Sequence, residues 1–374
     1  MRLPFRHVLS RLAEEGLLLI LLLAFALLLL LQPIGMHELG ALIHWETIWV
    51  LAGLMVLSRG LEASGGLARA AQWLLHRLRG ERRLAVVLIL FSAALSAVVT
   101  NDVALFIVVP MTLGLHSVAR LPIGRLIIFE AFAVNAGSTL SPVGNPQNLF
   151  LWQSSGAGFL EFTATMLPLA LVLTGLLLAL VPLAFPARRI EVSAGSYFPA
   201  FQRPMLWLSL LLYPIFLLMV EQGLVSLAAL AVIGLFLLLW PRSLLGVDWL
   251  LLLVFLLMFL VLGQLALLPP VAALAGGITE WPGGMLSGGI LLSQLISNVP
   301  AAIFLEGFTD DWRFLAWGVS VGGFGLAIGS MANLIALRLA RLPGLWWQFH
   351  LWSLPVLLLA MLLSYPLAWW WLGA

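Results

Sequence analysis

The amino-acid sequence predicts an all-α polytopic membrane protein built from two inverted repeats, each with a helical hairpin and a broken transmembrane helix. Its 374 residues are 63% hydrophobic and only 9% charged, with a mean hydropathy of +1.11, whereas soluble domains carry about 25% charged residues. Apolar runs recur along the chain at lengths that suit membrane spans. Two polar motifs that interrupt these runs occur twice, in the same order.

The first predicted repeat covers residues 1–200. Its apolar run at 16–31 is interpreted as an uncleaved first helix, because no small-residue cleavage site follows it. The further elements expected are a span at 47–57, an amphipathic interfacial helix at 67–79, a hairpin at about 84–118, a helix broken within about 122–155, a span at 162–183 and a polar loop at 184–204.

The second predicted repeat covers residues 201–374. The elements expected are spans at 205–220, 223–240 and 248–268, a hairpin at about 284–308, a broken helix at about 314–341 and a last helix at 346–373, bracketed by tryptophans. The hairpins and broken helices are predicted to form a transport domain, with the other spans as a scaffold. Each arm of the first hairpin rises about 25 Å, short of the ~30 Å apolar core, so re-entrant arms and thin spans both remain open.

The repeat is predicted from two paired motifs. The segments 96–104 and 293–301 both read S-x-x-x-[TS]-N-x-x-A, and the segments 144–149 and 329–334 both read G-x-x-x-N-L. Five spans lie between the two hairpins, and an odd number inverts the second copy. Inverted repeats with broken helices that meet near the membrane midplane are typical of secondary transporters.

The breaks have the chemistry of helix N-termini. Asn145 followed by Pro146 fits an N-cap and a first helical residue. Asn101 or Asp102, Asn298 and Ser330 fit the same capping role. Four half-helix N-termini would then point inward and favour an anion or an oxygen-rich solute.

The candidate site residues lie at the two tips and the two breaks. The binding candidates are Thr100, Asn101, Asp102, Ser138, Ser141, Gly144, Asn145, Asn148, Ser297, Asn298, Ser330 and Asn333. Asp102 and Glu130 are acids at membrane depth, where carboxylates are costly and usually functional, and they are the candidates for proton coupling. A sodium ion is expected, if sodium is used, at Asn101, Asp102 and Asn148.

The arginines predict the orientation. All 18 basic residues are arginine, and alternate assignment of the loops places 17 of them on one side and only Arg313 on the other. The positive-inside rule then makes the amino terminus cytoplasmic and the carboxyl terminus external. This topology also explains the basic pI without nucleic acid as a partner.

The chain resembles the ion transporter superfamily, which includes arsenite permeases, NhaD-type sodium/proton antiporters and divalent-anion/sodium symporters, and it is most similar to the YbiR-type permease branch. The blocks that carry the resemblance are 100–110 (TNDVALFIVVP), 125–150, 248–255, 293–300 and 322–338. The resemblance implies an elevator-like homodimer and sodium binding at Ser-Asn-Thr tips. Here the tips read Thr100-Asn101-Asp102 and Ser297-Asn298-Val299, and the missing threonines together with the acid favour protons or one cation.

The predicted function is secondary active transport of a small anion or weak oxyacid, coupled to protons or sodium, in the bacterial inner membrane. Na⁺/H⁺ antiport is the alternative. A passive channel is a third reading, and a membrane enzyme is disfavoured because no nucleophile–base pair is apparent. No P-loop occurs, and no cofactor is expected beyond the coupling ion. The expected partners are the lipid bilayer, the solute and a second copy of the chain.

Overall fold

Helices make up nearly all of the regular structure in the computed structural model, which describes residues 16–373 apart from 67–68, 70–79, 116–120 and 190–200. In the first half the helices are α2 (Gly16–Leu31), α3 (Met36–Leu42), α4 (Trp45–Ala63), α6 (Glu81–Val98), α7 (Asn101–Leu115), α8 (Ile123–Ser138), α9 (Pro146–Ser155) and α10 (Phe159–Ala184). In the second half they are α11 (Arg203–Glu221), α12 (Val225–Leu239), α13 (Pro241–Leu244), α14 (Trp249–Ala266), α15 (Pro269–Gly276), η1 (Gly277–Glu280), α16 (Gly284–Ile296), α17 (Asn298–Glu306), α18 (Trp312–Gly322), η2 (Ala327–Gly329), α19 (Met331–Ala340), α20 (Leu345–Ala368) and η3 (Trp369–Gly373).

The helices confirm an all-α membrane fold. The helices Phe159–Ala184, Arg203–Glu221, Trp249–Ala266 and Leu345–Gly373 are long and apolar enough to cross a bilayer. The second hairpin is shorter, because α16 has 13 residues and α17 has 9. They rise about 20 Å and about 14 Å, less than the ~30 Å apolar core, so neither arm crosses a bilayer alone.

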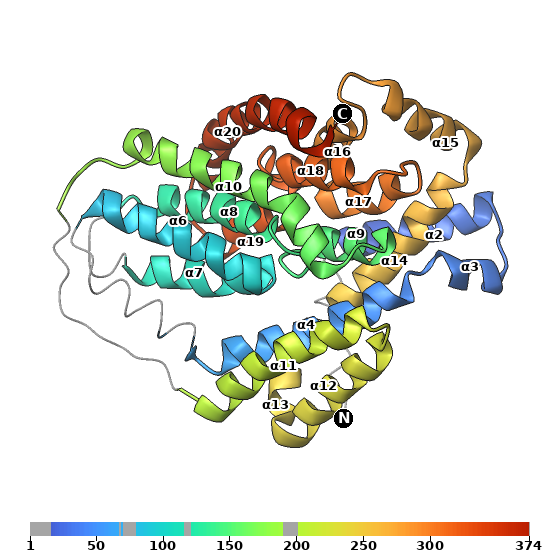
Figure 1. The fold of residues 1–374 in the computed structure, drawn as a ribbon, viewed down its shortest axis with the longest axis horizontal. Coiled ribbons are helices and arrows are strands. Elements are labelled where there is room, and N and C mark those ends of the chain that lie inside the picture. The colour runs from blue at the N-terminus through green and yellow to red at the C-terminus, as the bar shows by residue number, and fades with distance from the viewer. Residues whose placement is uncertain (1–15, 67–68, 70–79, 116–120, 190–200, 374) are drawn as a thin grey trace.

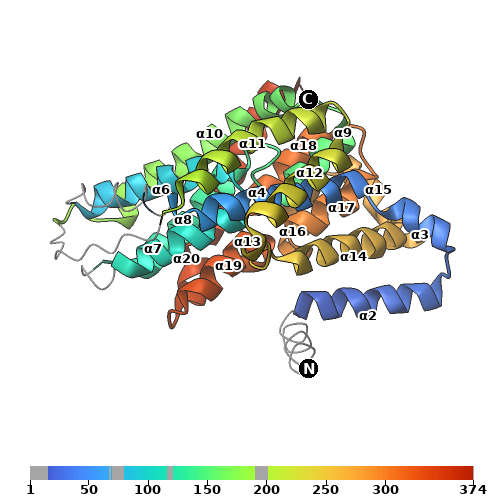
Figure 2. The same cartoon turned by 90° about the horizontal axis from the view of Figure 1, so that it is seen from below.

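Short gaps or irregular segments separate helices at the predicted tips and breaks. The arms α6 and α7 are separated by two residues, α16 and α17 by one, and the helices α8/α9 and α18/α19 flank irregular segments at 139–145 and 323–330. Figure 1 shows these elements above α4, which lies with α11, α12 and α13 along the lower edge. Viewed from below, α2 lies outermost next to α14 (Figure 2).

Helices of each hairpin pack against the neighbouring broken helix. The helix α6 packs on α8, and α16 packs on α18. Glycines permit the close approach: a Cβ on Gly137 would lie 2.0 Å from the Ala93 carbonyl oxygen, and one on Gly322 would lie 2.5 Å from Ser293 Cβ. Contacts also connect the two halves of the chain: α7 of the first half contacts α19 of the second, and α17 of the second half contacts α9 of the first.

Several local expectations need correction. The short helix α3 lies between the first helix and the second span, and that span extends to Trp45–Ala63 instead of 47–57. Ser297, and not Asn298, is the N-cap of α17, while α7 already includes Asn101 as its first residue. The amphipathic helix expected at 67–79 lies outside the described residues.

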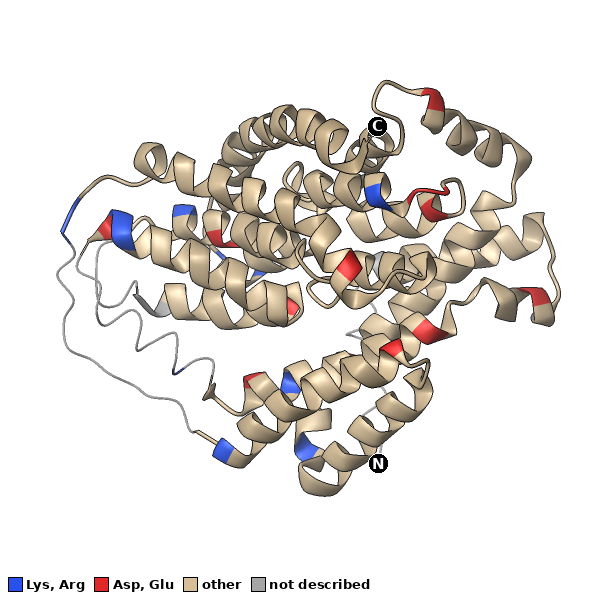
Figure 3. Ribbon diagram, in the orientation of Figure 1, with Lys and Arg blue, Asp and Glu red and all other residues tan. Residues whose placement is uncertain are grey.

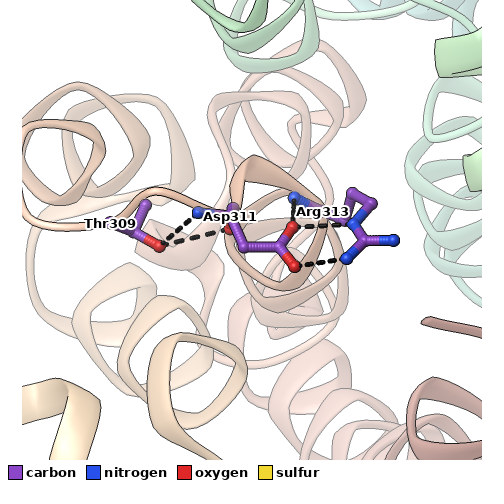
Figure 4. Close-up of polar contacts among 3 residues, drawn as sticks. All are labelled: Thr309, Asp311 and Arg313. Carbon is purple, nitrogen blue, oxygen red and sulfur yellow. Dashed lines mark hydrogen bonds and ion pairs between the residues drawn. The ribbon is translucent and has the colours of Figure 1, made fainter. Parts of the chain in front are cut away.

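Charge is distributed unevenly along the bundle. Figure 3 shows most arginine segments toward the left, where α6 and α11 begin and α4 ends, and most acidic segments toward the right. Arg313 is the arginine at the acidic end: its guanidinium donates two hydrogen bonds to Asp311, which also caps α18 (Figure 4).

Candidate functional site

The first break is held together by two asparagines. Asn145 caps α9 by accepting a bond from the Asn148 backbone N–H at 2.8 Å, and Pro146 occupies the first helical position, as predicted. The Asn145 side-chain amide donates to the Ser138 carbonyl oxygen at 3.0 Å and to its Oγ at 3.2 Å. The Asn148 amide nitrogen donates to the carbonyls of Ser138, Thr139 and Ser141. These bonds satisfy the backbone carbonyls that the end of α8 leaves unpaired.

The first hairpin tip is fastened to this break. The backbone N–H of Asn101 donates to the Gly144 carbonyl at 2.8 Å, and Ser141 Oγ donates to the Ala97 carbonyl at 2.7 Å. Gly144 is required here, because a Cβ would lie 2.4 Å from the Ser138 carbonyl oxygen. Thr100, 8% exposed, immediately precedes the tip helix.

The second break repeats part of this pattern. Ser330 caps α19, and the Asn333 amide donates to the Gly323 carbonyl at 2.9 Å. Donor and acceptor are ten residues apart, as Asn148 and Ser138 are in the first break. Gln294 of α16 connects the second hairpin to this break. Its side-chain nitrogen donates to the Gly322 carbonyl and its side-chain oxygen accepts from the Leu326 N–H, both at 2.7 Å.

Asn135 of α8 joins the two breaks. Its amide donates to the Gly323 carbonyl at 3.1 Å and to Asn333 Oδ1 at 2.8 Å. Its Oδ1 accepts from Ser330 Oγ at 2.9 Å. One turn later, Ser138 Oγ donates to the Asn135 carbonyl. A continuous polar network, defined here as Asn135, Ser138, Asn145, Asn148, Ser330 and Asn333, therefore runs between the two broken helices.

The second hairpin tip is strained and lies beside this network. Ser297 has φ 77° and ψ 154°, a region that residues other than glycine rarely adopt and that is found mainly at functional sites. Its Oγ is buried without a hydrogen-bond partner. The side-chain nitrogen of the next residue, Asn298, lies close to Gly323, since a Cβ built on that glycine would be 3.4 Å from it. It is therefore next to the carbonyl group to which both Asn135 and Asn333 donate.

Further buried polar atoms are available to a ligand. Within the described chain, Gln147 Oε1, Asn148 Oδ1 and Ser320 Oγ are buried without hydrogen-bond partners. Asn148 Oδ1 is fixed in direction because its amide nitrogen is already engaged with three carbonyls. Buried polar atoms normally find a partner, so these atoms mark places where a solute or ion can complete the bonding.

The two candidate acids lie in different surroundings. Asp102 is half-buried at the first tip, within Coulombic range of Asp248 at the start of α14. Glu130 is fully buried between α7 and α8, where it accepts a hydrogen bond from Thr112 Oγ1, and its Oε2 has no partner. The structure therefore does not bring Glu130 into hydrogen-bond contact with the polar network.

The three residues predicted to bind sodium differ in how their oxygens are hydrogen-bonded. Asn148 Oδ1 is a free buried oxygen, and the Asp102 carboxylate accepts no hydrogen bond within the described residues. Asn101 Oδ1 instead accepts from the Asp102 N–H at 2.9 Å. An ion at this tip would have to displace that bond or use the remaining oxygens.

Sequence reasoning missed three residues that the fold brings into the site. Asn135 is an amide in the otherwise apolar stretch 131–136, and this position is the signal that would have found it. Gln294 follows Ser293 inside the repeated motif, where the first copy has Ala97, so motif matching passed over it. Ser320 lies on α18 in a run of small residues and carried no such signal.

Comparisons with known proteins agree with this architecture. Residues 14–322 match the citrate transporter family profile. The chain is 43% identical to inner membrane protein YbiR of Escherichia coli over 337 residues, 90% of each chain. It is 32% identical to the uncharacterized transporter MJ0456 of Methanocaldococcus jannaschii over 323 residues, 84% of this chain and 86% of the relative.

A shorter match links the chain to a third relative. The putative transporter arsB of Dictyostelium discoideum is 29% identical over 133 residues, 36% of this chain and 23% of the relative. Together with the helical architecture, these matches confirm the resemblance predicted from the tip and break motifs. The chain is a multi-pass membrane transporter that belongs to the citrate transporter family, within the ion transporter superfamily.

Proposed function

We propose that the protein is a secondary active transporter of a small oxyanion or weak oxyacid, coupled to protons or sodium. The observation that carries this proposal is the buried polar network between the two broken helices, inside an otherwise apolar bundle. Both hairpin tips lie against it, through Asn101 and Asn298. Irregular backbone at membrane depth is tolerated where it is buried in protein or lines a cavity, and in transporters such sites bind the solute.

The chemistry of the site favours a neutral oxyacid or a monoanion. The helices α7, α9, α17 and α19 begin at the tips and breaks, and their first N–H groups have no partner within the helix. The caps already engage the N–H groups of Asn101, Asn148 and Ala332. The remaining first-turn N–H groups and the hydroxyls of Ser297 and Ser320 can donate to oxygens, whereas Asn148 Oδ1 can accept from a protonated one. The described residues of the network contain no arginine, so a multiply charged anion has no full countercharge.

An elevator-like movement is the alternating-access mechanism that we propose. The hairpins and broken helices are tied together by the bonds described above and would move as one unit. The rings of His44 and Phe259 on the scaffold contact Phe150 of α9, with centroids 4.9 Å and 5.5 Å from that ring. These ring contacts involve no hydrogen bond, whereas Trp317 of α18 donates to the Thr165 carbonyl of α10 and Ser287 of α16 bonds Tyr365 of α20, so the movement would have to break or carry along the bonds to α10 and α20.

For coupling we propose Asp102 as the acid that exchanges a proton or binds a cation. It lies at a half-helix N-terminus, within Coulombic range of the scaffold acid Asp248, whereas Glu130 already accepts a bond from Thr112. Asp102→Asn should therefore abolish driven transport more completely than Glu130→Gln. Full proton-coupled flux by Asp102→Asn in proteoliposomes would show that this acid only supports the tip.

Proteoliposomes with an internal pH dye test the substrate. A panel of oxyanions and oxyacids should produce proton flux or isotope uptake against a gradient, while Na⁺ or Li⁺ alone should move few protons. Sodium-driven proton movement without any oxyanion response would favour the Na⁺/H⁺ antiporter. The observation that supports this alternative is that two acids, Asp102 and Asp248, lie within Coulombic range of each other. Dissipation of an imposed solute gradient without uphill accumulation would favour a passive channel.

We also propose an inverted two-fold arrangement of residues 1–200 and 201–374, an inner-membrane location and a homodimer. Two observations support the repeat: α7 packs on α19 and α17 on α9, and at each break a hydrogen bond joins residues ten positions apart.

The cysteine-free chain allows single-cysteine labelling, which tests the orientation. An impermeant reagent applied from outside should label 152–161 and 306–313 but not 184–204; the reverse pattern would refute the cytoplasmic amino terminus.

A further inference from the structure

A cavity lies in the scaffold, on helices that do not contribute to the polar network. It has a volume of about 440 Å³. Its walls come from the end of α4, the start of α11 and the corner between α12 and α13. The described lining residues are Arg59, Ala63, Gln202, Met205, Leu239, Trp240, Pro241, Arg242 and Ser243.

The charged residues of this lining are both arginines. Arg59 pairs with Glu62 through one Nη at 2.7 Å, but its Nε is buried without a hydrogen-bond partner. The guanidinium packs on Gly246, where a Cβ would lie 2.4 Å from Nε, so its position is fixed by the fold. Arg242 is exposed and forms no ion pair among the described residues. One arginine held in place by the fold and one exposed arginine therefore line the same cavity.

The cavity lies at a membrane edge. It belongs to the end of the bundle where the arginine segments gather, and α4, α11 and α13 meet there (Figures 1 and 3). Leu239, which lines the cavity, is 51% exposed, and Leu238 beside it is 81% exposed. Trp240 follows directly, and tryptophan is enriched at the headgroup level of membranes. The cavity is thus polar at one end and continues into an apolar, lipid-facing surface.

We propose that this cavity binds the headgroup phosphate of an anionic phospholipid, whose acyl chains lie along α12. Arginine forks match phosphate oxygens, Gln202 and Ser243 supply further polar groups, and Leu238 and Leu239 provide the apolar path that a free phosphate ion would not need. Basic pockets between transmembrane helices on the cytoplasmic side bind such headgroups. This inference does not rest on the proposed transport activity.

Native mass spectrometry of the full-length protein in a neutral detergent tests the proposal. Phosphatidylglycerol should bind with one tight site, and phosphatidylcholine with the same acyl chains should bind much more weakly, because its choline is repelled by the arginines. Arg242→Gln should weaken phosphatidylglycerol binding about fivefold, and the Arg59→Gln/Arg242→Gln variant further, by about fivefold for each arginine removed. Arg338→Gln, an exposed arginine on α19, is the matched control and should bind as wild type does.

The outcomes separate the sources of the phosphate. Inorganic phosphate should neither compete with the lipid nor raise the melting temperature; competition at equal concentration would overturn the lipid assignment in favour of a free anion. Equal binding of both lipids, or an unchanged affinity in Arg242→Gln, would overturn the site. Arg242 is exposed, so this single variant keeps the test decisive if the double variant does not fold.

Discussion

Replacing Asn135 with alanine should destabilise the protein and uncouple its two broken helices. The side chain makes three hydrogen bonds to the second break: two donated to Gly323 O and Asn333 Oδ1, and one accepted from Ser330 Oγ. Side-chain hydrogen bonds inside membrane proteins contribute about 0.6 kcal/mol each. Loss of all three should therefore cost about 2 kcal/mol.

A double-mutant cycle isolates the central bond. Unfolding free energies of Asn135→Ala, Asn333→Ala and the double variant, measured in detergent, should give a coupling energy of about 0.6 kcal/mol and at most about 1.7 kcal/mol. Gln222→Leu, on an exposed turn after α11, is the control and should change stability by less than about 0.5 kcal/mol. A coupling energy of zero would refute the idea that Asn135 ties the breaks together.

Two further outcomes follow from the packing and from the loop before α18. Gly137→Ala should destabilise the protein by about 1–3 kcal/mol, because its Cβ would lie 2.0 Å from the Ala93 carbonyl oxygen, whereas Gly175→Ala meets nothing within 4 Å and should not lower the melting temperature. Burial raises the pKa of Asp311, but hydrogen bonds from Arg313 and its positive charge outweigh burial and hold that pKa below its ordinary value of 3.8. Folding therefore favours the ionised carboxylate of Asp311. Its contribution to stability is complete above the pKa of the unfolded chain and is lost as the pH falls through the lower pKa of the folded protein. Asp311→Asn should flatten the fall in melting temperature as the pH drops below about 5; an unchanged slope would contradict this.

The sequence by itself determined the class of protein and the positions of the breaks. The low charge content and the long apolar runs leave a helical membrane protein as the solution that pairs every backbone group. The breaks at Asn145-Pro146 and Ser330 were predictable because N-capping and the proline preference for the first turn act over three or four residues. The repeated motifs identified the tips for the same reason, since local chemistry suffices to stop and restart a helix.

Only the tertiary structure decided which polar groups meet. Asn135 acquires its role from partners 188 to 198 residues away in the chain, and no local pattern encodes such a contact. The positive φ of Ser297, which moves the cap of α17 one residue earlier than expected, is imposed by the hairpin closure, because an unstrained serine would avoid that region. The packing of α7 on α8 likewise places Glu130 against Thr112, where it forms no hydrogen bond with the polar network. Propensity acts along the chain, whereas these choices depend on how distant helices pack.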